Sequence, residues 1–344
     1  MVTEMKMHGD DKANLDVIKK PYVIAEAGSN FNQNLDEAKR LIDVAVKSRA
    51  NAVKFQLFKA DCLYPKKDGL YNVFKSLELN YEWLPKLKKH ADGQGIDFIA
   101  SAFDFESLDE LDRLGVWAHK IASSEVTNLK FLHYVASKKK PIFISTGMCD
   151  LVNVQEAINI ARNVGNNDIC IMQCGSMYPL PIKFANLLVI KAFKEQFNCH
   201  VGFSDHTLGF TASIVAVGLG ATVFEKHFTL DRNAPGPDHF YALEPNELGE
   251  YVEQIQNAHE CLGDQIKDML PDERLKGRRD GVYFSRDLIA GHVISTEDIV
   301  TRRPAGRISA RYSTVLLGGI LKEAVKAGDS PDWETLTFNR AESR

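Results

Sequence analysis

The chain has 344 residues, of which 44% are hydrophobic and 26% are charged, a composition typical of a globular protein. Its net charge of -4 gives no electrostatic reason to expect binding to nucleic acid or to an acidic membrane surface. We find no run of about 18 apolar residues, no apolar secretion signal in residues 1–20 and no CxxC pair among the six cysteines. We therefore expect a cytoplasmic protein that does not span a membrane.

Eight short segments rich in β-branched residues recur along the first two thirds of the chain, with helix-like stretches between them. They are 22–26, 52–56, 97–101, 118–123, 141–145, 169–173, 201–204 and 222–227. Their starts lie roughly 20 to 45 residues apart, the length of a βα unit. This pattern predicts an α/β fold of the (β/α)8 TIM-barrel type, although a doubly wound open sheet remains an alternative.

The intervening segments have helical periodicity. In residues 35–47 the side chains of Leu35, Ala38, Leu41, Ile42 and Ala45 fall on one helical face. In residues 153–165 we expect Asn153 to be the N-cap and Gly165 to lie just past the helix end.

The domain organisation follows from a hydrophilic stretch after the last strand. We expect an N-terminal extension at 1–20, a barrel at 21–262, a linker at 263–281 and a small, mostly β domain at 282–344. About 60 residues without disulfides form a thin core, so we expect the small domain to dock on another structure.

Polar residues occur at the carboxyl end of every predicted strand. In TIM barrels this is where catalytic groups from several strands meet. The pattern therefore predicts an enzyme with its site at that end of the barrel. The residues concerned are Glu26, Lys54, Gln56, Ser101, Lys120, Ser123, Ser145, Gln173, Ser176, Ser204, Asp205, His206, Glu225 and His227.

Two histidines at the ends of the last two predicted strands are candidate metal ligands. His206 and His227 are separated by about one βα unit. Two imidazoles leave coordination positions open for water and a substrate oxygen, and Mn²⁺, Co²⁺, Mg²⁺ or Zn²⁺ would fit so short a ligand list. The alternative is a pair of ordinary histidines without a metal.

Two lysines lie within otherwise apolar strands. Burying Lys54 or Lys120 is costly unless an anion or a carboxylate pairs with it, so these lysines and the nearby serines predict a site for a doubly anionic substrate. Two alternatives remain open: a lysine that forms a Schiff base, and a structural ion pair with Glu26 or Glu125.

The loops after two strands add further candidates. Asp238 lies in a turn-rich loop after the eighth strand and could hydrogen-bond to a polyol, or it could be an ordinary turn residue. Residues 178–181, which begin with Tyr178, predict a rigid loop after the sixth strand. Cys170 and Cys174 are expected to be core residues.

Taken together, these residues resemble the sialic acid synthase family, which includes the N-acetylneuraminate, legionaminate and pseudaminate synthases. The resemblance runs from about 21 to 338, in the order of the family. Residues 286–309 are similar to the antifreeze-like (SAF) domain of that family. The matching segments are IAEAGSN (24–30), AVKFQLFKA (52–60), HKIASSE (119–125), PIFISTGM (141–148), YPLP (178–181), GFSDHT (202–207), FEKHFT (224–229) and PGPDH (235–239).

The resemblance implies a reaction and a role for each matching position. The implied reaction condenses phosphoenolpyruvate with an N-acylated amino-sugar aldehyde and water to give a nonulosonic acid and phosphate. His206 and His227 match the metal-binding pair, with Mn²⁺ as the first choice and Mg²⁺ or Co²⁺ as others. Catalytic roles are implied for Glu26, Lys54, Gln56 and Lys120; phosphoenolpyruvate binding for Lys54, Ser101, Lys120, Ser123, Ser145, Ser176 and Ser204; and sugar binding for Gln56, Tyr178, Asp238 and Arg303. Because Arg303 matches an arginine lent by a second subunit, the resemblance also implies a domain-swapped homodimer.

The chain departs from the family pattern at several of these positions. Phe31 and Gln33 replace a histidine and a glycine after the first strand, Ser101 replaces a threonine, Ser176 replaces an asparagine, and Ala305-Gly306-Arg307 alters the arginine motif. We expect these changes to affect the choice of sugar rather than to abolish the chemistry.

Three other functions are compatible with parts of the pattern. The first is a phosphoenolpyruvate-dependent synthase for another aldose, and the second is a barrel aldolase that uses a lysine Schiff base. The third is a binding protein without catalysis, which recognises ice or carbohydrate through the C-terminal domain.

Overall fold

The eight predicted strands form a closed parallel barrel in the computed structural model, which describes residues 14–276 and 278–338. Strand β1 pairs with both β2 and β8, so the sheet has no free edge and the open-sheet alternative is wrong. The (β/α)8 prediction is confirmed. The strands are β1 Tyr22–Gly28, β2 Ala52–Leu57, β3 Asp97–Ala102, β4 His119–Ile121, β5 Ile142–Ser145, β6 Ile169–Cys174, β7 His200–Asp205 and β8 Val223–His227.

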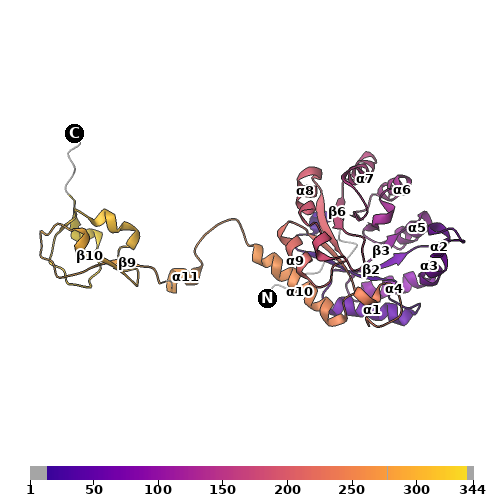
Figure 1. Cartoon of the computed structure of the whole chain (residues 1–344), viewed down its shortest axis with the longest axis horizontal. Coiled ribbons are helices and arrows are strands. Elements are labelled where there is room, and N and C mark those ends of the chain that lie inside the picture. The colour runs from indigo at the N-terminus through magenta and orange to yellow at the C-terminus, as the bar shows by residue number, and fades with distance from the viewer. Residues whose placement is uncertain (1–13, 277, 339–344) are drawn as a thin grey trace. The chain divides into compact units, whose positions relative to one another are not determined.

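Helices surround the strands in the barrel unit (Figure 1). One helix follows most of the strands, and three separate β2 from β3. Their bounds are α1 Leu35–Lys47, α2 Ala60–Leu63, α3 Tyr71–Leu77, α4 Leu84–Gly93, α5 Phe105–Arg113, α6 Leu129–Ser137, α7 Leu151–Asn163, α8 Leu188–Phe197, α9 Thr211–Gly218 and α10 Pro245–Leu262.

Two of these helices test the expected boundaries. Helix α1 buries the predicted face and begins after Asn34, whose side chain accepts hydrogen bonds from two backbone amides. The predicted N-cap of α7 is wrong. Asp150 is the N-cap, and Asn153 lies three residues later, where it completes a reciprocal capping box. Asparagine is suited both to the N-cap position and to the third helical position, so its residue type alone does not show where the helix begins.

The barrel has two layers of buried side chains. The large outer layer lies between the strands and the helices, and the smaller inner layer fills the barrel with residues such as Ile24, Ile99 and Phe143. Leu15, in the segment expected to be an N-terminal extension, is fully buried in the inner layer. Its backbone amide donates a hydrogen bond to Asp168 at 2.9 Å. Leu15 therefore belongs to the barrel core and Ile18 packs against it, while Asn14 and Asp16 are exposed. Residues 1–13 of the expected extension lie outside the described residues.

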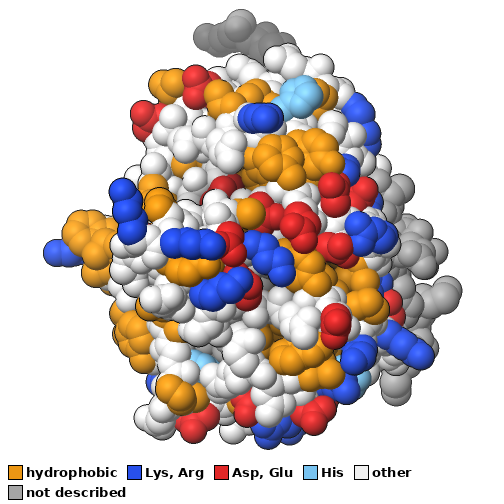
Figure 2. Space-filling model, turned by 90° about the vertical axis from the view of Figure 1, so that its right-hand side faces the viewer, with side chains coloured by type: hydrophobic (Ala, Val, Ile, Leu, Met, Phe, Trp, Pro, Cys, Tyr) orange, Lys and Arg blue, Asp and Glu red, His pale blue; other side chains and the backbone are white. Residues whose placement is uncertain are grey.

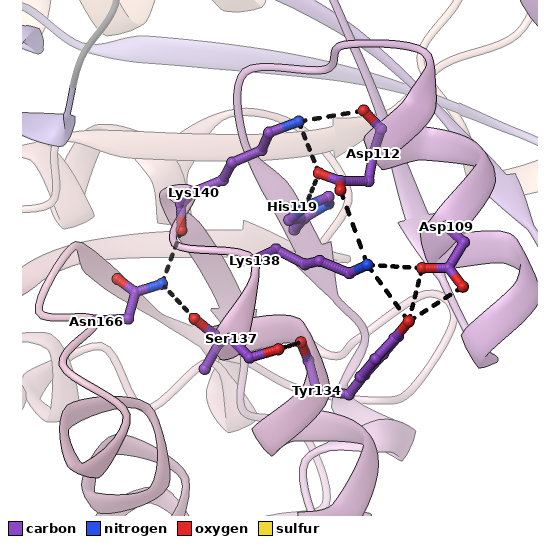
Figure 3. A network of polar contacts seen from close by, with 9 residues as sticks. Asp109, Asp112, His119, Tyr134, Ser137, Lys138, Lys140 and Asn166 are labelled. Atoms are coloured by element: carbon purple, nitrogen blue, oxygen red, sulfur yellow. Dashed lines mark hydrogen bonds and ion pairs between the residues drawn. The ribbon is translucent and has the colours of Figure 1, made fainter.

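The amino ends of β4 and β5 carry an ion-pair network (Figure 3). Lys138 lies 2.7 Å from Asp109, and Lys140 lies 2.9 Å from Asp112. His119 is buried beside them, and burial lowers its pKa to about 4, so the imidazole is neutral at pH 7. This network lies at the amino end of the barrel, away from the predicted active site.

The C-terminal unit spans Asp264–Arg344 and is compact by itself. The predicted linker contains a short helix, α11 Pro271–Lys276. The unit has two small sheets, β9 Gly281–Phe284 with β10 Ile299–Arg302, and β11 Ile320–Leu321 with β12 Leu336–Thr337. Its core is a separate cluster that includes Val282, Phe284 and Leu316.

Asp298 is a fully buried carboxylate in this unit. It accepts hydrogen bonds from Arg286 at 2.7 Å and Ser295 at 2.7 Å, and it lies 2.8 Å from His292. Burial alone would raise its pKa, but these hydrogen bonds outweigh burial and hold the pKa well below its ordinary value. Folding therefore favours the ionised form of Asp298. The stability that this carboxylate contributes is present above its unfolded-state pKa and is lost as the pH falls through its folded-state pKa.

We expect Asp298→Asn to destabilise the C-terminal unit at pH 7 because the amide cannot replace an ionised acceptor for these donors. Amide hydrogen exchange of residues 281–302 in the full chain should become faster, and the difference from the unchanged protein should shrink as the pH falls below about 4. Asp287→Asn, at an exposed carboxylate of the same unit, is the control. Equal exchange rates in Asp298→Asn and the unchanged protein at pH 7 would contradict this account.

Among the described residues, we find no helix with the length and apolarity needed to cross a membrane. On the face shown in Figure 2, acidic and basic side chains are interspersed with apolar ones. That face therefore presents both signs of charge rather than a field of one sign.

Candidate active site

A cavity of about 540 Å³ lies at the carboxyl ends of the barrel strands. Of the polar strand-end residues, Gln173 and Asp205 do not line it: Gln173 donates to the Ala185 carbonyl, and Asp205 pairs with Lys226. Every barrel residue for which the resemblance implies a role does line it. These residues are Glu26, Lys54, Gln56, Ser101, Lys120, Ser123, Ser145, Ser176, Tyr178, Ser204, His206, His227 and Asp238. Side chains two residues apart lie on the same face of a strand. Lys54 and Gln56 of β2 therefore both face the cavity, as do Glu225 and His227 of β8.

The floor of the cavity is a buried cluster of two lysines and two glutamates. The Nζ atom of Lys54 lies 2.9 Å from Glu26 and 3.6 Å from Glu225. The Nζ atom of Lys120 lies 3.7 Å from Glu225. Each lysine also donates a hydrogen bond to a serine, Lys54 to Ser101 at 2.8 Å and Lys120 to Ser145 at 2.6 Å. The structural Lys–Glu pair that the sequence left open is therefore present, within the candidate anion site.

The pKa values of the two glutamates are shifted in opposite directions. Burial raises the pKa of Glu26, and the Glu225 carboxylate adds to this increase, while Lys54 only partly offsets it. For Glu225, burial is outweighed by Lys120 and Lys54, which lower its pKa. Two neighbouring carboxyl groups with diverging pKa values are typical of an acid–base pair. The shifts favour the ionised form of Glu225 and make Glu26 the better suited of the two to carry a proton.

A wall of hydroxyl and amide groups adjoins Lys120. Ser123 accepts a hydrogen bond from the backbone amide of Gly147 at 2.8 Å. The Ser176 hydroxyl is buried and, among the described residues, has no hydrogen-bond partner. A Cβ atom at Gly147 would lie 2.2 Å from the Ser176 oxygen, so only glycine leaves room for that hydroxyl. These groups could donate to a phosphate or carboxylate oxygen.

The mouth of the cavity carries the candidate sugar-binding residues. Gln56 donates a hydrogen bond to Glu26 at 3.1 Å, and Asp238 is held by Tyr241 at 2.9 Å. Tyr178 is 48% exposed, and its ring centroid lies 4.2 Å from that of His206. These side chains offer hydrogen bonds and a ring face to a ligand above the lysines.

Gly28, at the end of β1, leaves room for these groups. Its φ of +55° disfavours any residue with a Cβ atom, and an added Cβ would lie 3.2 Å from the Asp238 carboxylate. We expect Gly28→Ala to raise the KM for the sugar at least about tenfold because Asp238 must shift. Steady-state kinetics with each substrate varied in turn would measure this. Gly93→Ala, which meets open space in α4, is the matched control, and an unchanged KM in Gly28→Ala would contradict the account.

The two candidate metal ligands face each other across β7 and β8. The ring centroids of His206 and His227 lie 5.5 Å apart. The Nδ1 atom of His206 lies 2.8 Å from the Gly175 carbonyl, and the Nδ1 atom of His227 lies 3.3 Å from the Tyr241 hydroxyl. Burial lowers the pKa of His227 well below its ordinary value, and neighbouring cationic groups lower it further. A neutral imidazole with one engaged nitrogen is the form that binds a metal.

These residues fit a metal with few protein ligands. A carbonyl can only accept, so the Nδ1 atom of His206 carries a proton. Burial lowers the pKa of His206, but Cys174, the Gly175 carbonyl and Glu225 outweigh burial and raise it, so a metal would bind the neutral ring at Nε2 in competition with a second proton. Within residues 14–276 and 278–338, no group of three or more His, Cys, Asp or Glu side chains could hold a metal. His206 and His227 would therefore hold an ion with several positions left for oxygen ligands, as a Lewis-acid site requires.

Sequence reasoning missed or misjudged several cavity residues. The sequence places Glu225 at a strand end without indicating a role for it, although it bridges both lysines. Cys170 is a core residue as expected, whereas Cys174 also lines the cavity and lies 3.8 Å from His206. One side of the cavity is apolar and comes from the segment around α2 and α3. Its residues include Leu63, Tyr64, Leu70, Val73, Phe74 and Leu77. The short helices gave no motif that could have placed them there.

Arg303 belongs to the C-terminal unit. There it pairs with Asp280 at 2.9 Å and is 66% exposed. Arg307 of the altered motif pairs with Asp332 at 2.9 Å in the same unit.

The departures in the first loop have a local structural explanation. Phe31 is fully buried, and its ring packs 6.2 Å from that of Phe55. Asn32 and Gln33 take left-handed conformations, with φ of 48° and 53°. The Asn32 side chain lies 3.1 Å from His239 in the loop after β8. An apolar anchor and a contact to His239 thus hold the loop.

Comparison with known proteins agrees with this geometry. A sequence model described as the NeuB family matches residues 41–267. The chain belongs to the NeuB family. Among solved structures, this NeuB-family chain is similar to an N-acetylneuraminic acid (sialic acid) synthetase from Leptospira borgpetersenii in complex with citrate. The TM-score is 0.72 at 30% identity, over 75% of this chain and 90% of that one.

Two curated relatives extend the similarity to most of the NeuB-family chain. An N,N'-diacetyllegionaminic acid synthase from Legionella pneumophila is 39% identical over 334 residues, which is 91% of this chain and 94% of the relative. A protein of the same name from Campylobacter jejuni is 38% identical over 327 residues, or 90% and 98%.

Proposed function

We propose that this protein is a sialic-acid-type synthase. It condenses phosphoenolpyruvate with an N-acylated amino-sugar aldehyde, such as N-acetylmannosamine or a diacetamido-hexose, and with water, to give a nonulosonic acid and phosphate. One observation carries the proposal: a buried cluster of two lysines with a hydroxyl wall lies in the same cavity as two histidines suited to a metal. The similarity to named legionaminic acid synthases supports the choice of substrates.

The chain's own residues would bind and orient phosphoenolpyruvate. Lys54 and Lys120 neutralise its carboxylate and phosphate, which are two anionic groups on a small rigid molecule. The serines at 101, 123, 145, 176 and 204 donate hydrogen bonds around them. Because both ammonium groups are buried and already fixed by glutamates, they need no reorganisation when the substrate binds.

The reaction joins C3 of the enol to the aldehyde carbon. Gln56, Tyr178 and Asp238 hold the open-chain sugar above the lysines. His206 and His227 would hold the metal, Mn²⁺ as first choice, which supplies Lewis-acid polarisation when bound. Attack leaves positive charge at C2, water adds there, and phosphate departs. Glu26, whose pKa is raised, can hold or release a proton beside this centre.

The second unit and the cellular setting complete the proposal. Exposed Arg303 would reach the sugar pocket of a second copy in a domain-swapped homodimer. The six cysteines are all free thiols, which suits a reducing compartment such as the cytoplasm.

A phosphate-release screen tests the function. Phosphoenolpyruvate would be offered with N-acetylmannosamine, a diacetamido-hexose or arabinose 5-phosphate, with and without added Mn²⁺. We expect metal-dependent phosphate release with an amino sugar. Release only with arabinose 5-phosphate would identify a synthase for another aldose.

One observation favours the alternative of a lysine aldolase: burial lowers the pKa of Lys120, as a lysine that forms a Schiff base requires. Borohydride trapping separates the two mechanisms. A stable lysine adduct formed with substrate would overturn the synthase mechanism. Absence of an adduct together with stoichiometric phosphate would support it.

A further inference from the structure

Tyr241 lies behind the cavity, at the end of the short 3-10 helix His239–Tyr241. Tyr241 is 5% exposed, and its hydroxyl contacts two candidate site residues, one predicted to bind the metal and one predicted to bind the sugar. The hydroxyl donates to the Asp238 carboxylate at 2.9 Å and lies 3.3 Å from the Nδ1 atom of His227. Its ring packs 5.2 Å from that of His227. A single side chain thus contacts a candidate metal ligand and a candidate sugar ligand.

The hydrogen bonds at this hydroxyl have a fixed direction. A tyrosine hydroxyl has one proton, and here that proton goes to the Asp238 oxygen. The hydroxyl oxygen can then only accept from His227, so the imidazole proton sits on Nδ1 and Nε2 keeps its lone pair. The Gly175 carbonyl imposes the same arrangement on His206. In each neutral imidazole the proton is therefore directed to Nδ1 by a group outside the cavity lining, Tyr241 for His227 and the Gly175 carbonyl for His206.

The second Asp238 oxygen has a different neighbourhood. It is the oxygen that approaches Gly28 and lies 3.9 Å from His227. Tyr241 takes the first oxygen and leaves the second available to a ligand.

We propose that Tyr241 is a positioning residue that fixes His227 for the metal and Asp238 for the sugar through one hydroxyl group. This inference rests on the proposed function for its sugar part, whereas its metal part can be tested without turnover. It predicts that metal affinity and sugar KM are linked through a residue that touches neither ligand.

Tyr241→Phe removes the hydroxyl and keeps the ring. We expect Mn²⁺ affinity, measured by electron paramagnetic resonance titration of the full chain without substrates, to fall about tenfold or more. We also expect the KM for the amino sugar to rise about tenfold. The KM for phosphoenolpyruvate should stay within about twofold, because the lysine and serine contacts are not attached to this hydroxyl.

Tyr134→Phe is the matched control. Tyr134 also donates to a carboxylate, Asp109 at 2.8 Å, but at the amino end of the barrel (Figure 3). It should lose a similar hydrogen bond while Mn²⁺ affinity and both KM values stay unchanged.

The single variant Asp238→Ala keeps the test available if Tyr241→Phe folds poorly, and a double-mutant cycle adds a second test where both variants fold. Asp238→Ala frees the tyrosine proton, which can then point at His227 and disturb its tautomer, so Mn²⁺ affinity should fall although Asp238 does not bind the metal. The two changes should be non-additive in Mn²⁺ affinity.

Three outcomes would overturn the proposal: Mn²⁺ affinity in Tyr241→Phe equal to that of the unchanged protein, equal increases in both KM values, or additive effects in the cycle. A protein that releases no phosphate with any amino sugar would contradict the proposed function instead, and the Mn²⁺ titration would still decide the role of Tyr241.

Discussion

Lys54→Met is expected to lower phosphate release at least about a hundredfold and to reduce the free energy of unfolding by about 3–5 kcal/mol. Lys54 lies 2.9 Å from Glu26 and 3.6 Å from Glu225, and all three side chains are buried. Removing the ammonium leaves Glu26 without its counter-charge and leaves Glu225 with Lys120 alone. It also removes one of two cations that would bind the substrate. Steady-state kinetics and urea unfolding would measure the two effects separately.

A second substitution distinguishes the loss of chemistry from the loss of stability. Lys54→Met combined with Glu26→Gln removes the unpaired carboxylate, so most of the stability should return while turnover stays low. Lys138→Met is the control, because that lysine pairs with Asp109 at 2.7 Å in the network far from the cavity. Turnover in the double variant close to that of the unchanged protein would show that Lys54 only balances charge.

Removal of the metal is expected to have the second largest effect. After treatment with a chelator, phosphate release should fall to background, and added Mn²⁺ should restore it. His206→Ala and His227→Ala should each weaken Mn²⁺ binding at least about a hundredfold, since each leaves a single protein ligand among the described residues. Calorimetric titration with Mn²⁺ would give the affinities.

The control for the histidines is His90→Ala, at the surface beside Asp43. It should leave Mn²⁺ affinity unchanged. A chelated protein that keeps full turnover would remove the metal from the proposed function, whatever the two histidines do.

Much of the fold could be predicted because its signals are local. Buried parallel strands are short apolar runs, and each predicted run overlaps an observed strand, with ends that differ by one or two residues. The number of βα units favours a closed barrel, but only the pairing of β1 with β8 decides against the open sheet. The cap of α7 was misplaced because Asp150 and Asn153 both suit a cap, and only the backbone decides between them.

The site could be predicted as a set of residues but not as a set of partners. The period of two and the strand ends were enough to bring Lys54, Lys120, His206 and His227 to one cavity. The bridge from Glu225 to both lysines spans separate strands of the ring, so it depends on the barrel closing with a particular stagger. Tyr241 was missed for a similar reason, because nothing in its sequence surroundings points to His227.

The segment between β2 and β3 has a consequence for how such an enzyme can diversify. Helix α3 has no buried residue, and the segment forms one apolar side of the cavity. Side chains of α3 can change with little cost to folding, because none of them belongs to the barrel core, unlike those of α4. The residues that stabilise the barrel and the α3 residues that line the cavity thus belong to different parts of the chain. Mutation can explore new acceptors in this segment while the groups that hold the anion stay as they are.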